Sequence, residues 1–136
     1  MHELIHWHNS YSVFVKSIDD QHKMLIDLLN ELYDAYLHNK YHEKIGQIIA
    51  QLLEYAAEHF STEETYFEKY NYDGAREHIA EHKMFIAKIK EFERDYHKHD
   101  TTTTLMAINF LNDWLKHHIL ETDRQYIPCF LKHKVQ

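Results

Sequence analysis

The sequence is poor in the residues that make turns and end helices. Of its 136 residues, two are glycine and one is proline. All-β proteins place many glycines and prolines in their turns, so this scarcity favours long helices joined by few connections. The length is typical of one domain and is sufficient for a hydrophobic core.

The sequence also has little cysteine, no long apolar run and fewer basic than acidic residues. Cys129 is the single cysteine, so no internal disulfide forms, which fits a reducing compartment. No run approaches the roughly 18 apolar residues of a membrane span, and the first residues lack the pattern of a secretion signal. The net charge of −7 disfavours nucleic acid and anionic membranes as main partners. We therefore expect a cytoplasmic protein.

Apolar residues recur with the period of an amphipathic helix in four stretches. They predict helices over about 18–39, 42–69, 73–97 and 103–121, with N-caps offered by residues 17–20 and by Asp73. Residues 1–17 form an irregular arm, and 122–136 form a C-terminal tail in which Pro128 limits a continued helix. We predict an all-α fold over residues 1–136, a single domain: an up-down-up-down four-helix bundle with an irregular N-terminal arm.

Histidine is abundant, with fourteen residues scattered along the chain, and for nine of them we expect exposure to solvent. Five histidines and two carboxylates instead follow the apolar faces of the predicted helices or end the last one. They are His22, His59, Glu63, His78, His82, His118 and Asp123. In an up-down-up-down bundle, the helix ends that carry these seven residues lie at one end, so the residues fall at a similar height.

Spacing within this set is typical of metal ligands. His59 and Glu63, like His78 and His82, are four residues apart and so lie one turn apart on one helix face, where they can share a metal. One buried histidine alone is more often a hydrogen-bonded structural residue, and a polar network without metal is the alternative for the whole set. Unpaired buried carboxylates are costly, and a metal centre offsets that cost. Seven ligands suit two ions.

The ligand types narrow the choice of metal. Cys129 lies outside the set, which disfavours structural zinc and iron–sulfur clusters. Calcium and magnesium prefer oxygen ligands over imidazoles. Imidazole suits zinc, copper and nickel as well as iron, so these residues alone leave the metal open.

Asp123 is the least regular member of the set. It follows His118 by five residues, which on an α-helix places the two side chains about 140° apart around the axis. Either the helix end distorts here, or Asp123 comes from just beyond the helix.

Three motifs carry a family resemblance: H-F-x-x-E-E at 59–64, H-x-x-x-H at 78–82 and H-I-x-x-x-D at 118–123. With Trp7 and the D-x-Q-H segment that ends at His22, they closely resemble the hemerythrin family over nearly the whole chain. The N-terminal segment and the tail are similar to the bacterial branch, the bacteriohemerythrins.

The resemblance implies two non-haem iron ions with an oxo or hydroxo bridge. His78, His82 and His118 would hold one iron, and His22 and His59 would hold the other and leave one position open. Glu63 and Asp123 would bridge the two ions.

The implied function is reversible O2 binding, as an oxygen carrier, store or local supplier to an oxygen-consuming recipient protein, and not as an enzyme. A monomer is the default expectation. Only two carboxylates accompany the five histidines, a less anionic set than in carboxylate-rich di-iron proteins, which favours carrying O2 over cleaving it. The alternatives are a di-iron oxidase, peroxidase or nitric-oxide reductase, an oxygen or redox sensor that works with a separate partner, and iron storage.

Several neighbours of the candidate ligands have predicted roles. We expect Trp114, Leu115 and Ile119 to pack in the core beside His118 and so to line the O2 pocket, and the resemblance supports this for the last two. Gln21 and Glu64 are candidate hydrogen-bond partners of ligating imidazoles. Because adjacent residues point about 100° apart on a helix, we expect both at the solvated rim. His117 should be exposed.

Overall fold

The computed structural model describes residues 4–38, 42–96 and 101–135. Four long helices dominate it: α1 (Lys16–Leu37), α2 (His42–Lys69), α3 (Ala75–Tyr96) and α4 (Thr101–His117). A π-helical turn η2 (His118–Thr122), a 3-10 turn η3 (Asp123–Tyr126) and the short helix α5 (Ile127–Lys132) follow without a break. The described residues contain no strand.

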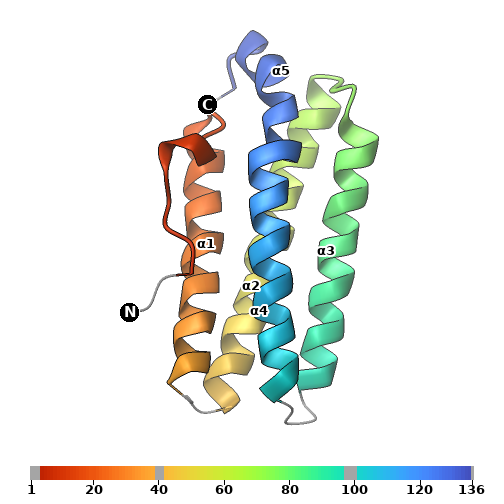
Figure 1. Ribbon diagram of the computed structural model, residues 1–136. Helices are drawn as coiled ribbons and strands as arrows, with labels where there is room; N and C mark the ends of the chain where they lie inside the picture. The colour runs from red at the N-terminus through yellow and green to blue at the C-terminus, as the bar shows by residue number, and fades with distance from the viewer. Residues whose placement is uncertain (1–3, 39–41, 97–100, 136) are drawn as a thin grey trace.

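The long helices stand side by side and alternate in direction, so the chain runs up, down, up and down (Figure 1). α1 contacts α2 and α4, and α3 contacts the same two helices, which closes the bundle around one interior. The prediction of an all-α, up-down-up-down bundle is confirmed. Among the described residues, no helix is both long and apolar enough to cross a membrane.

The start of α1 differs from the prediction and explains how the N-terminal arm is held. The helix begins at Lys16, and its first N–H groups receive no side-chain cap from Val15. Asp19, one of the expected caps, instead accepts hydrogen bonds from Ser12 Oγ at 2.6 Å and from the Val13 N–H at 2.9 Å. The arm runs along α1 (Figure 1) and contains a 3-10 turn, η1, at Asn9–Tyr11.

The starts of α3 and α4 differ from the predicted ones by two residues. α3 begins at Ala75 instead of 73, and α4 begins at Thr101 instead of 103. α2 spans His42–Lys69, as predicted. The predicted helix ends at 39 and 97 lie outside the described residues.

The C-terminal tail is more helical than its proline suggested. Pro128 lies in the first turn of α5, where a missing N–H leaves no helical hydrogen bond unmade, so helical structure continues through it. Tyr126 and Phe130 are fully buried and pack with Val13, Val15 and Phe67. This second core cluster covers the end of the bundle at which α1 and α3 begin, and the main core fills the rest.

Candidate metal centre

The seven predicted site residues converge in the bundle interior. Each is at most 2 % exposed. They come from every long segment of the fold: His22 from α1, His59 and Glu63 from α2, His78 and His82 from α3, and His118 and Asp123 from η2 and η3. The bundle therefore brings all seven together at one height, as the sequence predicted.

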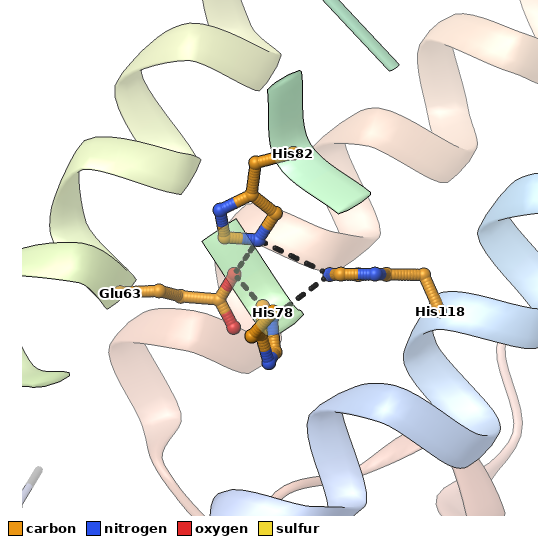
Figure 2. A group of neighbouring side chains, drawn as sticks. All are labelled: Glu63, His78, His82 and His118. Atoms are coloured by element: carbon orange, nitrogen blue, oxygen red, sulfur yellow. Dashed lines mark hydrogen bonds and ion pairs between the residues drawn. The ribbon is translucent and has the colours of Figure 1, made fainter. Parts of the chain in front are cut away.

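Three imidazoles and one carboxylate form a first group (Figure 2). The Nε2 atom of His118 lies 3.1 Å from Nε2 of His78 and 3.2 Å from Nε2 of His82. Glu63 Oε1 lies 3.2 Å from His82 Nε2 and 3.8 Å from His78 Nε2. Three ring nitrogens that face one another and a carboxylate are the arrangement of a cation site.

Two imidazoles and two carboxylates form the second group, His22, His59, Glu63 and Asp123. His22 Nε2 lies 2.9 Å from Asp123 Oδ2, and His59 Nε2 lies 3.2 Å from Glu63 Oε1. In each group, one ligand atom from every member lies within 4.8 Å of the others.

The two carboxylates lie between the groups. Asp123 Oδ1 is 2.9 Å from Nε2 of both His78 and His118, whereas its Oδ2 faces His22 of the other group. Glu63 meets both groups through Oε1, which faces His59 on one side and His82 on the other. Either carboxylate is thus placed to contact two ions.

A change of helix type places Asp123. The Asp123 N–H donates to the carbonyl of His118, five residues earlier, which is the hydrogen bond of a π-turn. Five residues then make about one full turn, and His118 and Asp123 face the same side. Of the two possibilities left by the sequence, the distorted helix end is the one that occurs.

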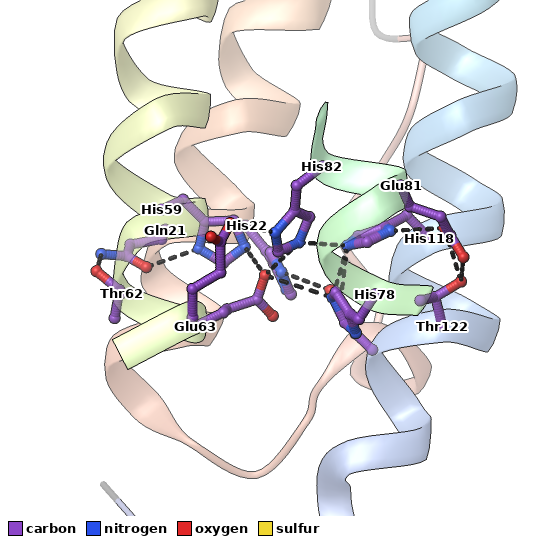
Figure 3. A network of polar contacts seen from close by, with 12 residues as sticks. Gln21, His22, His59, Thr62, Glu63, His78, Glu81, His82, His118 and Thr122 are labelled. Carbon is purple, nitrogen blue, oxygen red and sulfur yellow. Dashed lines mark hydrogen bonds and ion pairs between the residues drawn. The ribbon is translucent and has the colours of Figure 1, made fainter. Parts of the chain in front are cut away.

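Hydrogen bonds from the outer ring nitrogens orient three imidazoles (Figure 3). The Nδ1–H of His59 donates to Gln21 Oε1 at 2.7 Å, and that of His82 donates to Glu64 Oε2 at 2.9 Å. Such acceptors fix the ring and leave the inner Nε2 lone pair free for a metal. Gln21 and Glu64 are only partly buried, so they lie at the rim as expected, and each also binds a histidine on a neighbouring helix, the partner role for which they were candidates.

Glu81 is a functional residue that sequence reasoning missed. Its Oε1 accepts from His118 Nδ1 at 3.0 Å, and its two oxygens accept from Thr122 Oγ1 at 2.9 and 3.0 Å. Its position next to His82 in the H-x-x-x-H motif was the available signal, because the residue beside a ligand points toward the adjacent helix.

Aromatic rings clamp two of the imidazoles. Phe60 stacks on His82 with centroids 3.8 Å apart and planes 8° apart, and Trp114 stacks on His118 at 4.3 Å and 12°. Leu115 and Ile119 are buried beside them, as expected, and a role of these residues in lining an O2 pocket stays a prediction. His117 is exposed and pairs with Glu121 at 2.6 Å.

Comparison with known proteins identifies the family. The family model of the hemerythrin HHE cation binding domain matches residues 13–130, a range that contains all seven site residues. The chain belongs to the hemerythrin family. The resemblance inferred from the motifs is thereby confirmed.

Individual hemerythrin relatives match over most of their length. A bacteriohemerythrin of Clostridium acetobutylicum is 35% identical over 127 residues, which are 89% of this chain and 97% of that protein. A bacteriohemerythrin of Methylococcus capsulatus is 32% identical over 111 residues, or 82% of this chain and 84% of its own. A crystal structure of wild-type hemerythrin matches the fold with a TM-score of 0.82 at 30% identity, covering 93% of this chain and 97% of that one.

The two buried carboxylates of the site have lowered pKa values. Burial raises the pKa of Glu63, but the surrounding imidazoles, His59 first, outweigh it and hold the pKa well below its usual value. Burial and the charge of Glu63 likewise oppose ionisation of Asp123, yet His118 and His22 lower its pKa. Both carboxylates are therefore ionised at neutral pH.

The pKa values of two imidazoles shift in opposite directions. Burial lowers the pKa of His59, and the carboxylates offset this only in part. For His118, burial is outweighed by Asp123 and Glu81, which raise its pKa to about 10. Without metal, a proton on His118 therefore balances part of the carboxylate charge.

The donor set fits a pair of cations. Within the described residues, His22 Nε2, His59 Nε2 and the oxygens of Glu63 and Asp123 are buried and have no hydrogen-bond partner. Buried polar atoms without partners are costly, and unpaired charges are costlier still. A cation in each group would satisfy these atoms. Cys129, the single cysteine of the sequence, lies outside both groups of candidate ligands found among the described residues.

Proposed function

We propose that this hemerythrin-family protein binds O2 reversibly at a pair of non-haem iron ions with an oxo or hydroxo bridge, and serves as an oxygen carrier, store or local supplier. The observation that carries the proposal is the placement of Asp123, whose two oxygens face two separate groups of buried imidazoles at 2.9 Å.

Each residue of the centre has a role in this proposal. His78, His82 and His118 would hold one iron, and His22 and His59 would hold the other, with Glu63 and Asp123 contacting both. Two bound ferrous ions would supply the electrons that reversible O2 binding requires, and the ion held by two histidines would supply the open position that the family resemblance implies.

The surrounding residues keep the donor atoms in place and keep water away. Gln21, Glu64 and Glu81 hold the outer nitrogens of His59, His82 and His118. Trp114 stacks on His118, and Leu115 and Ile119 of the same core cluster would complete an apolar wall there. An apolar wall disfavours the entry of water and protons, and so favours release of unchanged O2 over its reduction.

The placement of the acidic residues favours a carrier over an enzyme. Glu64 and Glu81 are carboxylates that contact the histidines of the centre, and both already bind outer ring nitrogens. Neither is therefore free to act as an acid or base on a substrate. The proposal extends to an oxygen-consuming recipient protein and to a monomer in the reducing cytoplasm.

The test is to load the metal-free protein with ferrous iron under argon and then cycle it between O2 and argon. We expect about two irons per chain, as in two-metal sites, and an optical spectrum that changes with O2 and reverts under argon. His118→Ala should lose iron or reversibility, whereas His117→Ala, at an exposed neighbouring site, should retain both.

Three results would contradict the proposal. Sustained consumption of O2 with an added reductant would identify a di-iron redox enzyme, and irreversible bleaching would exclude a carrier. Iron far in excess of a pair per chain would indicate storage.

A further inference from the structure

A groove between α2 and α3, on the outside of the bundle, has no role in the function proposed above. Its volume is about 530 Å³, which lies within the range of small-molecule sites, roughly 300–1,000 Å³. Its apolar lining consists of Phe60, Ile86 and two exposed alanines, Ala57 and Ala87. Because one alanine lies on each helix and both side chains are small, they leave room for another molecule.

The contact between Glu64 and His82 fixes how the two helices lie along this groove. Glu64 Oε2 accepts from His82 Nδ1 at 2.9 Å, and α2 and α3 run in opposite directions (Figure 1). From this contact the groove continues backward along α2 to Ala57 and forward along α3 to Lys90. The eight residues from His82 to Lys90 are about 12 Å of helix, so the groove has two separate ends.

The two ends of the groove differ in charge. The end next to the metal centre is lined by Glu64, Glu68 and Lys83. At the other end Lys90 lies across from the small side chain of Ala57. None of the described residues forms an ion pair with Lys90. The far end therefore offers a free positive charge, and an apolar surface leads away from it.

That apolar surface leads to one of the candidate metal ligands. Phe60 lines the groove and stacks on the ring of His82 with centroids 3.8 Å apart. Glu64, which also lines the groove, holds the outer nitrogen of the same ring. A molecule in the groove would therefore contact both side chains that hold His82 in place.

We propose that the groove between α2 and α3 binds a small amphipathic anion, a linear carboxylate of about ten carbons, whose head group pairs with Lys90 and whose chain lies over Phe60. A cation is disfavoured, because Glu64 is already bound to His82. A second copy of this chain is disfavoured as well, since two molecules with a net charge of −7 repel each other. The bound chain excludes water from the hydrogen bond between Glu64 and His82, which strengthens it.

The length of the ligand is tested by calorimetry on protein loaded with zinc, which has no redox chemistry. Linear carboxylates from hexanoate to dodecanoate are titrated below the concentrations at which they form micelles. The affinity should rise about fourfold for each added methylene and level off near decanoate, where the chain fills the groove. Decyltrimethylammonium, which has the same chain and a positive head group, should not bind. The proposal would be overturned by equal binding of this cation, by an absence of decanoate binding, or by binding to phosphatidylglycerol vesicles in place of decanoate.

Variants on α3 test the position of the ligand. Lys90→Gln should weaken decanoate binding about fivefold, as expected for the loss of one exposed ion pair. Ala87→Trp should abolish binding, because the indole fills the groove. The matched controls are Lys88→Gln, whose lysine pairs with Glu91 at 3.7 Å, and Met84→Trp at a site 55% exposed. Neither position lines the groove, so both controls should bind as wild type does. Equal losses in variants and controls would show that decanoate binds elsewhere.

Nuclear magnetic resonance tests the contact with His82. Decanoate should shift the side-chain signals of Phe60 and slow the exchange of the His82 Nδ1 proton with water. Signals that shift only outside the groove would contradict the proposal, and so would a dimer of the free protein that Ala87→Trp dissociates, since a second copy would then occupy the groove. All three experiments use zinc and no O2. Failure of the proposed function, seen as missing iron or irreversible O2 chemistry, therefore leaves their outcome unaffected.

Discussion

The N–H of Asp123 donates to the carbonyl of His118, and the same turn places Asp123 Oδ1 2.9 Å from His118 Nε2. On an α-helix, residues with this spacing would lie about 140° apart. One π-turn supplies the missing rotation and lets two residues of one segment meet both groups of the centre. π-turns are rare and occur frequently at functional sites.

Asp123→Asn should abolish the binding of two metal ions. The amide keeps the shape of the side chain but loses the charge that faces His22, His78 and His118. In the metal-free variant, the pKa of His118 should fall from about 10, since burial then meets less opposition. Iron per chain and NMR titration of the histidine test the two effects. Asp113→Asn, on the exposed face of α4, is the control. Unchanged iron in Asp123→Asn would exclude the bridging role.

Helical periodicity in the sequence was sufficient to predict the bundle and to bring the seven candidate ligands to one level. It could not predict the π-turn, because the choice between the two turn types depends on a single backbone hydrogen bond at Asp123. Nor could it predict Pro128 inside a helix, since that depends on the turn η3 preceding it.

The hydrogen-bond partners of the histidines could not be assigned from the sequence for a related reason. Gln21 precedes His22 in the chain but serves His59, and Glu81 precedes His82 but serves His118. A residue next to an inward-facing ligand points sideways, toward the adjacent helix. The side chain of that residue therefore does not contact the ligand next to it in the chain, and instead contacts the outer ring nitrogen of a ligand on the adjacent helix. The pairing depends on helix packing, which one sequence does not specify.

Metal binding should release protons and strengthen as the pH rises. His118 is protonated in the metal-free protein up to a pH of about 10, because Asp123 and Glu81 outweigh the effect of burial. It must lose that proton to bind a metal. The apparent affinity for zinc should therefore increase by about tenfold per pH unit for each proton released. Calorimetry at pH 8 in buffers of different ionisation enthalpy measures the release directly. Binding without proton release would contradict the raised pKa.

The stability of the metal-free protein should decline on both sides of neutrality. The pKa of His118 is raised from 6.5 to about 10, so its contribution is complete below pH 6.5 and is lost as the pH rises through about 10. The pKa of His78 is also raised, so its contribution has the same sign. The pKa values of Glu63 and Asp123 are lowered, so their contribution is lost as the pH falls below their ordinary values of 4.5 and 3.8.

Urea unfolding at pH 6.5, 8 and 9.5 tests the alkaline side of this profile. The lowered pKa of His59 works in the opposite direction only below 6.5, so it does not mask the alkaline decline. Asp123→Asn should flatten the decline because it removes the main cause of the raised pKa of His118. An alkaline limb that is equally steep in this variant would assign the decline to other groups.

Glu81→Gln should weaken metal binding without removing either ion. The amide oxygen can still accept from His118 Nδ1, but the negative charge that makes the imidazole a better ligand is lost. We expect zinc affinity to fall by about 10- to 100-fold, with a full pair of ions still bound at saturating metal. Competition with a chelator measures the change. Glu77→Gln, one turn earlier on the exposed side of α3, should have no effect, and a similar loss there would point to net charge as the cause.

Leu115→Ala separates packing from protection of the O2 site. Leu115 is buried, so truncation should destabilise the metal-free protein by about 2–5 kcal/mol, measured by urea unfolding. If Leu115 also lines the O2 pocket, the cavity admits water beside His118, and the oxygenated protein should convert irreversibly to the ferric form faster. Leu105→Ala, at a site 40% exposed on the same helix, should change neither quantity. Lower stability with an unchanged conversion rate would limit Leu115 to the core, because the same cavity would then have no route to the iron.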